Sequence, residues 1–151
     1  MLRRLQTTSN KPVDAMFKAG AAMVRGMAVQ KDMANKVAVL PTSDDDLYFV
    51  TNDDHATGLM TYEGEISSYD LRFENIPEGG KILLEKALPG ERYATDQIIT
   101  NGLSVGDYLT VETTAGADKG KWKKAGSGDT TLYKYGGEYK DGGKTLHIIQ
   151  A

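Results

Sequence analysis

The chain has 151 residues, of which 40% are hydrophobic and 26% are charged, and its formal net charge at neutral pH is −3. This length predicts one domain with a core large enough to fold without cross-links. The absence of cysteine excludes disulfides, thiolate metal sites and cysteine nucleophiles. Because no apolar run suggests a signal peptide or a membrane-spanning helix, we expect no membrane partner.

Residues 1–11 predict an extended N-terminal arm, because they are polar and basic and offer little apolar surface to bury. From 12 to 29 the chain is apolar but is interrupted by Gly20 and Gly26. Two glycines in so short a run disfavour a helix by about 1 kcal/mol each, so this segment predicts short strands and turns. Residues 12–151 are expected to form a single β-domain.

The rest of the chain alternates short β-type runs with turn residues. Gly142 and Gly143, which lie between two such runs, predict a hairpin turn. Short strands at this spacing predict an all-β fold, either a small antiparallel β-barrel or a β-sandwich. The predicted strands are 36–40, 47–51, 58–62, 69–73, 81–88, 92–95, 98–99, 108–112, 121–124, 132–135 and 146–150. The apolar pattern of 81–88 also suits a helix, and its length of eight residues favours the strand.

Patterns typical of catalytic or metal sites are weak in this sequence. His55 and His147 have no Gly-x-Ser-x-Gly elbow beside them that would present a nucleophile. Acidic residues at 44–46 and 53–54 lie at the two ends of a predicted strand, and a calcium-binding loop would need them closer together. We therefore expect no catalytic residues, no metal and no cofactor.

Charge is sorted along the chain into three blocks. Lys and Arg outnumber Asp and Glu by 7 to 2 in residues 1–41, are outnumbered by 15 to 4 in 42–114, and outnumber them again by 7 to 4 in 115–151. The block charges are therefore +5, −11 and +3, which add up to −3. Such blocks orient a protein on a repeating surface or on copies of itself, so the pattern favours assembly over chemistry.

An alternative function is indicated by the aromatic and basic residues near the C-terminus. Trp122, Tyr133 and Tyr135 alternate with lysines, as on surfaces that bind oligosaccharide or single-stranded nucleic acid. The acidic character of the whole chain argues against a nucleic-acid partner. A strand with lysines on one face and a packed aromatic layer on the other explains the same pattern.

Two glycine-containing segments share a recognisable pattern. In 18–29, small and apolar residues separate Gly20 from Gly26 before a first strand. In 101–109, Gly102, Gly106 and Asp107 lead into a later strand. These segments resemble those of tailed-phage capsid decoration proteins, which are also called cement or head-stabilisation proteins.

The resemblance implies a structural virion protein with a β-barrel or β-tulip body on the capsid exterior, made in the host cytoplasm. Its partner would be the major capsid protein, whose subunit contacts it would stabilise, and the N-terminal arm would reach along the lattice. Some such proteins form trimers and others bind as monomers or dimers, so self-association is expected without a fixed copy number. The residues expected to contact the capsid are Arg3, Arg4, Leu5, Lys11, Lys18 and Arg25.

Overall fold

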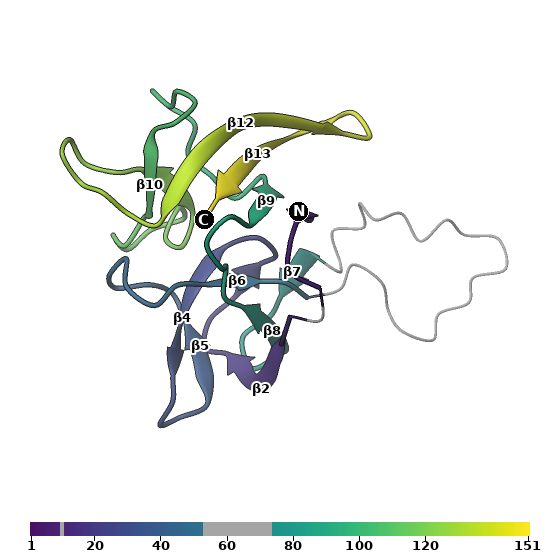
Figure 1. Cartoon of the computed structure of the whole chain (residues 1–151). Coiled ribbons are helices and arrows are strands. Elements are labelled where there is room, and N and C mark those ends of the chain that lie inside the picture. The colour runs from purple at the N-terminus through teal and green to yellow at the C-terminus, as the bar shows by residue number, and fades with distance from the viewer. Residues whose placement is uncertain (10, 53–73) are drawn as a thin grey trace, which may run out of the picture.

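The computed structural model describes residues 1–9, 11–52 and 74–151. The protein is all-β, as predicted, and contains a closed five-stranded barrel and a six-stranded sheet. In Figure 1 the long β12–β13 hairpin of the sheet lies on one side of the molecule, and the barrel strands β2, β4, β5 and β8 lie on the other. The predicted strands at 58–62 and 69–73, together with His55, Asp53 and Asp54, fall outside the described residues.

The barrel closes in the order β2-β5-β4-β6-β8. Neighbouring strands are antiparallel except for β2 and β5, which run parallel. Apolar side chains such as Phe17, Val29, Val50 and Ile82 form one buried cluster inside it. The strand bounds are β2 (Asp14–Ala19), β4 (Ala28–Asp32), β5 (Val37–Val39), β6 (Tyr48–Val50) and β8 (Lys81–Glu85).

The six-stranded sheet is antiparallel throughout, in the order β1-β9-β13-β12-β10-β11. Gly142 and Gly143 form the predicted hairpin turn, with φ of 53° and 83°, values that favour glycine. A separate pair joins β3 (Met23–Val24) to β7 (Asn75–Ile76). The sheet strands are β1 (Leu2–Gln6), β9 (Arg92–Thr95), β10 (Tyr108–Val111), β11 (Trp122–Lys124), β12 (Tyr133–Asp141) and β13 (Lys144–Gln150).

Barrel and sheet share one aromatic core. The ring of Phe49 on β6 stacks on Tyr93 of β9, with centroids 4.5 Å apart, and on Trp122 of β11 at 4.9 Å. Tyr133 packs edge-on against Trp122, and Tyr135 is buried in the same cluster. The alternative ligand-binding face predicted at Trp122, Tyr133 and Tyr135 is therefore wrong, because these rings fill the core instead of facing solvent.

The turn between β3 and β4 also approaches the six-stranded sheet closely, at Gly26. This glycine has a φ of +92°, and a Cβ added to it would lie 2.1 Å from Thr95 Oγ1. Its carbonyl oxygen accepts a hydrogen bond from Trp122 Nε1 at 3.3 Å. A side chain at this position would therefore push this turn away from the sheet.

The N-terminal segment is extended, as predicted, but it is not a free arm. Leu2–Gln6 form the edge strand β1, which pairs with β9 from Leu2↔Thr95 to Gln6↔Arg92. The amino group of Met1 lies 2.6 Å from Asp96 Oδ1 and 2.7 Å from Glu74 Oε2. This segment therefore belongs to the sheet. None of the described residues forms a helix long and apolar enough to cross a membrane.

Candidate docking groove at the mouth of the barrel

One end of the barrel opens into a groove of about 670 Å³. Because β8 is antiparallel to β2 and β6, and β6 is antiparallel to β4, this end gathers the start of β2 and β6 and the end of β4 and β8. Tyr48 and Leu84 lie among the residues that line it, together with residues 11–16. Mouths of β-barrels are frequent binding sites, and the volume is in the usual range for a ligand pocket.

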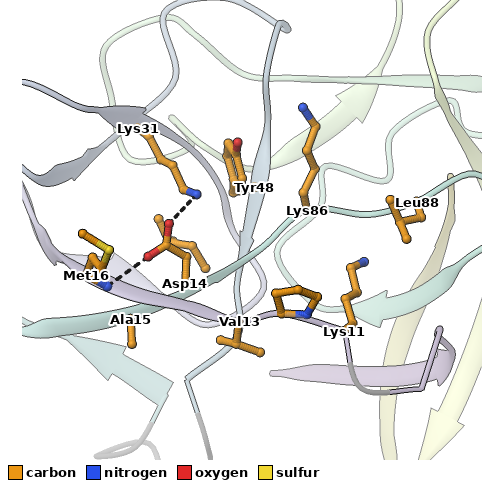
Figure 2. Close-up of a pocket in the computed structure, with 11 residues that line it drawn as sticks. Lys11, Val13, Asp14, Ala15, Met16, Lys31, Tyr48, Lys86 and Leu88 are labelled. Carbon is orange, nitrogen blue, oxygen red and sulfur yellow. Dashed lines mark hydrogen bonds and ion pairs between the residues drawn. The ribbon is translucent and has the colours of Figure 1, made fainter.

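An ion pair crosses this mouth (Figure 2). Lys31 Nζ on β4 donates to Asp14 Oδ2 on β2 at 2.7 Å, and Asp14 Oδ1 accepts the backbone N–H of Met16 at 3.0 Å. The hydrogen bond from Lys31 and then that from Met16 hold the pKa of Asp14 below its usual range. Lys31 Nζ also lies 4.0 Å from the ring centroid of Tyr48, within the range of a cation–π contact.

A second lysine stands just beyond the end of β8. Lys86 Nζ donates to Asp46 Oδ1 at 2.6 Å, and it lies 5.6 Å from the ring centroid of Tyr48. The side chains of Lys86 and Asp46 are 51% and 58% exposed, so this ion pair is open to water. The hydrogen bond to Asp46 raises the pKa of Lys86 above its usual range.

Exposed apolar side chains gather at the same groove. In the described part of the chain six large apolar residues are exposed, and three of them line this groove: Met16 at 70%, Leu88 at 44% and Val13 at 41%. Scattered apolar residues on a surface need no explanation, but a group in one hollow is typical of an interaction site. The groove therefore combines apolar walls with accessible positive charge.

A buried polar network fixes the wall formed by residues 11–13. Lys11 forms an ion pair with Glu91 and donates to Tyr93 Oη at 2.8 Å, while Tyr93 Oη donates to Glu85 Oε1 at 2.6 Å. Burial raises the pKa of Glu91, but the hydrogen bonds from Lys11 and from the backbone of Thr8 and Leu88 outweigh burial and lower it to about 2. The network thus attaches the segment before β2 to β8, β9 and the loop between them.

A second groove, of about 310 Å³, shares Lys86 with the first. Asp44, Asp45 and Asp46 line it, together with Thr110 and the exposed Leu132. The Lys86–Asp46 pair thus stands where a basic groove adjoins an acidic one. Four of the six exposed large apolar residues in the described segments line these two grooves.

Most of the residues predicted to contact the capsid are engaged within the protein. Arg3 pairs with Asp141, Arg4 Nη2 lies 2.8 Å from Glu85 Oε2, and Leu5 packs beside Met1, Ala94 and Leu146. Lys11 is buried in the network described above, and its stem lines the groove. Arg25 is buried beside Glu74, so a surface role for it is wrong. Lys18 is exposed on β2.

Groove residues that sequence reasoning missed are Val13, Met16, Lys86 and Leu88. The exposure of Met16 and Leu88 carries no sequence signal, because apolar residues flank them (Ala15 and Phe17, Ala87 and Pro89) and such runs look like core positions. The other histidine considered, His147, has its Nδ1 2.9 Å from Tyr135 Oη, and burial lowers its pKa. Among the described residues, no three histidine or acidic side chains converge as metal ligands would.

The chain matches no family model, no curated protein and no solved structure. Its function therefore has to be inferred from its own residues.

Proposed function

We propose that this protein is a structural decoration protein that binds the outer surface of a tailed-phage capsid through the barrel-mouth groove. The observation that carries the proposal is the gathering of Val13, Met16 and Leu88 in one hollow beside Lys86. The all-β architecture with a closed barrel and the resemblance of segments 18–29 and 101–109 to decoration proteins support the same function.

Docking would act through burial of these apolar side chains. Fully burying an exposed Val, Leu or Met side chain contributes roughly 1.5–3 kcal/mol. Because Val13, Met16 and Leu88 are only partly exposed, each would contribute a part of that to the contact between one copy and the shell. The contributions of many copies on one shell then combine, because each copy binds neighbouring capsomers at once. Lys86 and Asp46, which lie between the two grooves, would orient the protein through contacts with polar groups of the shell.

In this proposal the N-terminal strand has a structural role that differs from the arm expected from the sequence. Because β1 pairs with β9, and because Arg3 and Arg4 pair with Asp141 and Glu85, the segment contributes to the fold of the protein. Shell binding is therefore assigned to the groove, and the basic residues of 1–11 stabilise the sheet and the groove wall.

Co-sedimentation with purified heads of the phage that carries the gene tests the proposal. The purified chain is mixed with expanded, DNA-filled heads and separately with unexpanded heads, and the bound copies per head are counted. We expect saturable binding to expanded heads at a simple multiple of the lattice symmetry sites. Absence of binding to both kinds of head, at concentrations well above those of an infected cell, would overturn it.

A further inference from the structure

Each lysine that lines the groove is paired with a carboxylate of the protein, and only Lys86 is accessible to another molecule. Three lysines and one carboxylate, that of Asp14, are among its lining residues. Lys31 is engaged with Asp14, and Lys11 with Glu91, and both lysine side chains are largely buried. Lys86 is half exposed, so it is the cation that an incoming group would meet.

The present partner of Lys86 shows which chemistry this lysine accepts. Its ammonium donates to the carboxylate of Asp46, on the turn before β6, at 2.6 Å. Ion pairs between exposed side chains contribute only about 0–1 kcal/mol, so a carboxylate from another molecule exchanges with Asp46 at little cost. Asp46 therefore acts as an internal competitor for the site.

Apolar contacts next to Lys86 would supply the affinity that a surface ion pair lacks. Leu88 lies two residues further along the chain, and Val13 and Met16 line the same groove. Methionine has three rotatable bonds and a polarisable sulfur, so the exposed Met16 adapts to differently shaped apolar partners. A ligand that offers a carboxylate without an apolar neighbour would leave these side chains in water.

The charges around the groove also favour a protein segment over a polyanion. On the far side of Lys86 the second groove is lined by Asp44, Asp45 and Asp46, which would repel successive phosphates of a nucleic acid. A single carboxylate, by contrast, can bind Lys86 without placing a second negative charge over these aspartates.

We infer that the barrel-mouth groove binds a protein segment with a carboxylate beside an apolar side chain, and that this carboxylate replaces Asp46 on Lys86. The inference rests on the proposed shell-docking function, and it names the chemistry of the segment that the shell would present. Asp46 then lowers the affinity slightly, since it must leave Lys86 before the segment binds.

The test uses the full chain and a synthetic peptide, Ac-Leu-Asp-Leu-NH₂, with Ac-Leu-Asn-Leu-NH₂ as its uncharged twin. Binding is followed by NMR shifts of the Met16 methyl group and of Leu88. We expect the acidic peptide to shift both signals and the twin to bind about two- to fivefold more weakly. Removal of the competitor in Asp46→Asn should tighten binding of the acidic peptide about two- to fivefold, whereas Lys86→Met should remove the preference for the acidic peptide over its twin.

Lys140→Met is the matched control, because Lys140 is an exposed lysine on β12 that also pairs with a surface carboxylate, Glu138. It should leave peptide binding unchanged. Equal binding of both peptides, or weaker binding by Asp46→Asn, would overturn the inference. So would self-association of the chain that Lys86→Met abolishes, because a second copy would then be the occupant.

Failure of this inference is distinguishable from failure of the proposed function. If the chain binds expanded heads but the acidic peptide leaves Met16 and Leu88 unaffected, the carboxylate chemistry is wrong and shell docking stands. If the peptide binds the groove but no head is bound, the segment chemistry stands and the shell is the wrong partner.

Discussion

Lys31 and Asp14 form an ion pair across the mouth of the barrel, with Lys31 Nζ 2.7 Å from Asp14 Oδ2. The pair joins the end of β4 to the start of β2, which are not neighbours in the barrel because β5 lies between them. It therefore holds the two sides of the groove at a fixed separation. The shape of the candidate docking site depends on this contact.

Lys31→Met should lower the free energy of unfolding by about 1–2 kcal/mol, because a hydrogen bond to a charged group contributes roughly 1.5–3 kcal/mol and the partial exposure of Asp14 to water reduces this. Because the pKa of Asp14 is depressed, its share of the stability is present above its ordinary pKa and is lost as pH falls through the lower folded value. Urea unfolding at pH 7 and at acidic pH measures both effects. Lys121→Met, which breaks a more exposed pair with Asp118, is the control and should cost less.

Glu91→Gln should weaken the wall formed by residues 11–13. The change leaves Lys11 with a neutral partner and should cost about 1.5–3 kcal/mol. Glu91 has a depressed pKa of about 2, so its stabilisation is complete above its ordinary pKa of 4.5 and disappears as pH falls towards 2. The difference in unfolding free energy between wild type and variant should therefore be constant above pH 4.5 and shrink below it. A pH-independent difference would contradict this role for the charge.

Gly26→Ala should weaken the packing of the turn before β4 against the six-stranded sheet. The added Cβ would meet Thr95 Oγ1 and would also lie 3.0 Å from the Met1 carbonyl oxygen, at a φ that only glycine adopts easily. Gly102→Ala is a matched control, because Gly102 has a φ of +70° and nothing within 4 Å of the added Cβ. Alanine is strained at the positive φ of either position, so the two variants share this loss of stability. Gly26→Ala should lower the free energy of unfolding by about 1–3 kcal/mol more than Gly102→Ala, as measured by thermal unfolding. An equal loss of stability in the two variants would show that the added Cβ at position 26 fits beside Thr95 without a clash.

Trp122 should behave as a buried fluorophore. Its indole is stacked on Phe49 and donates to the Gly26 carbonyl oxygen, so iodide should hardly quench its emission in the folded protein. Adding an oligosaccharide or single-stranded DNA should leave the emission unchanged, because the ring has no exposed face. Strong quenching by iodide without denaturant would contradict the aromatic core described above.

Strand positions could be predicted well where turns and β-type residues agree. Residues 92–95 were predicted as a strand and form β9, and the Gly142–Gly143 turn joins β12 to β13 as expected. The strand at the N-terminus could not be predicted in this way. Arg3 and Arg4 resemble solvated arm residues, and their partners Asp141 and Glu85 lie far away in the sequence.

The candidate site was harder to predict than the fold. Alternating aromatics and lysines near Trp122 and Tyr133 look the same in the sequence whether the aromatic face binds a ligand or fills a core. The structure shows that it fills the core, because Phe49 of β6 packs against both rings. At the groove, the register between β2 and β8 shifts between Asp14 and Phe17, and this irregularity accompanies an exposed Met16 beside a buried Phe17. Such a shift depends on barrel closure and not on local sequence.

The most direct test of groove-mediated docking compares Met16→Asp with Val105→Asp in co-sedimentation with expanded phage heads. Met16 is 70% exposed in the groove and Val105 is 74% exposed outside its lining, so both variants should fold with little change in thermal stability. We expect Met16→Asp to weaken binding to the heads by at least about tenfold, because it places a charge among apolar contacts, and Val105→Asp to bind like wild type. Equal binding by the two variants would contradict the assignment of the groove as the docking site.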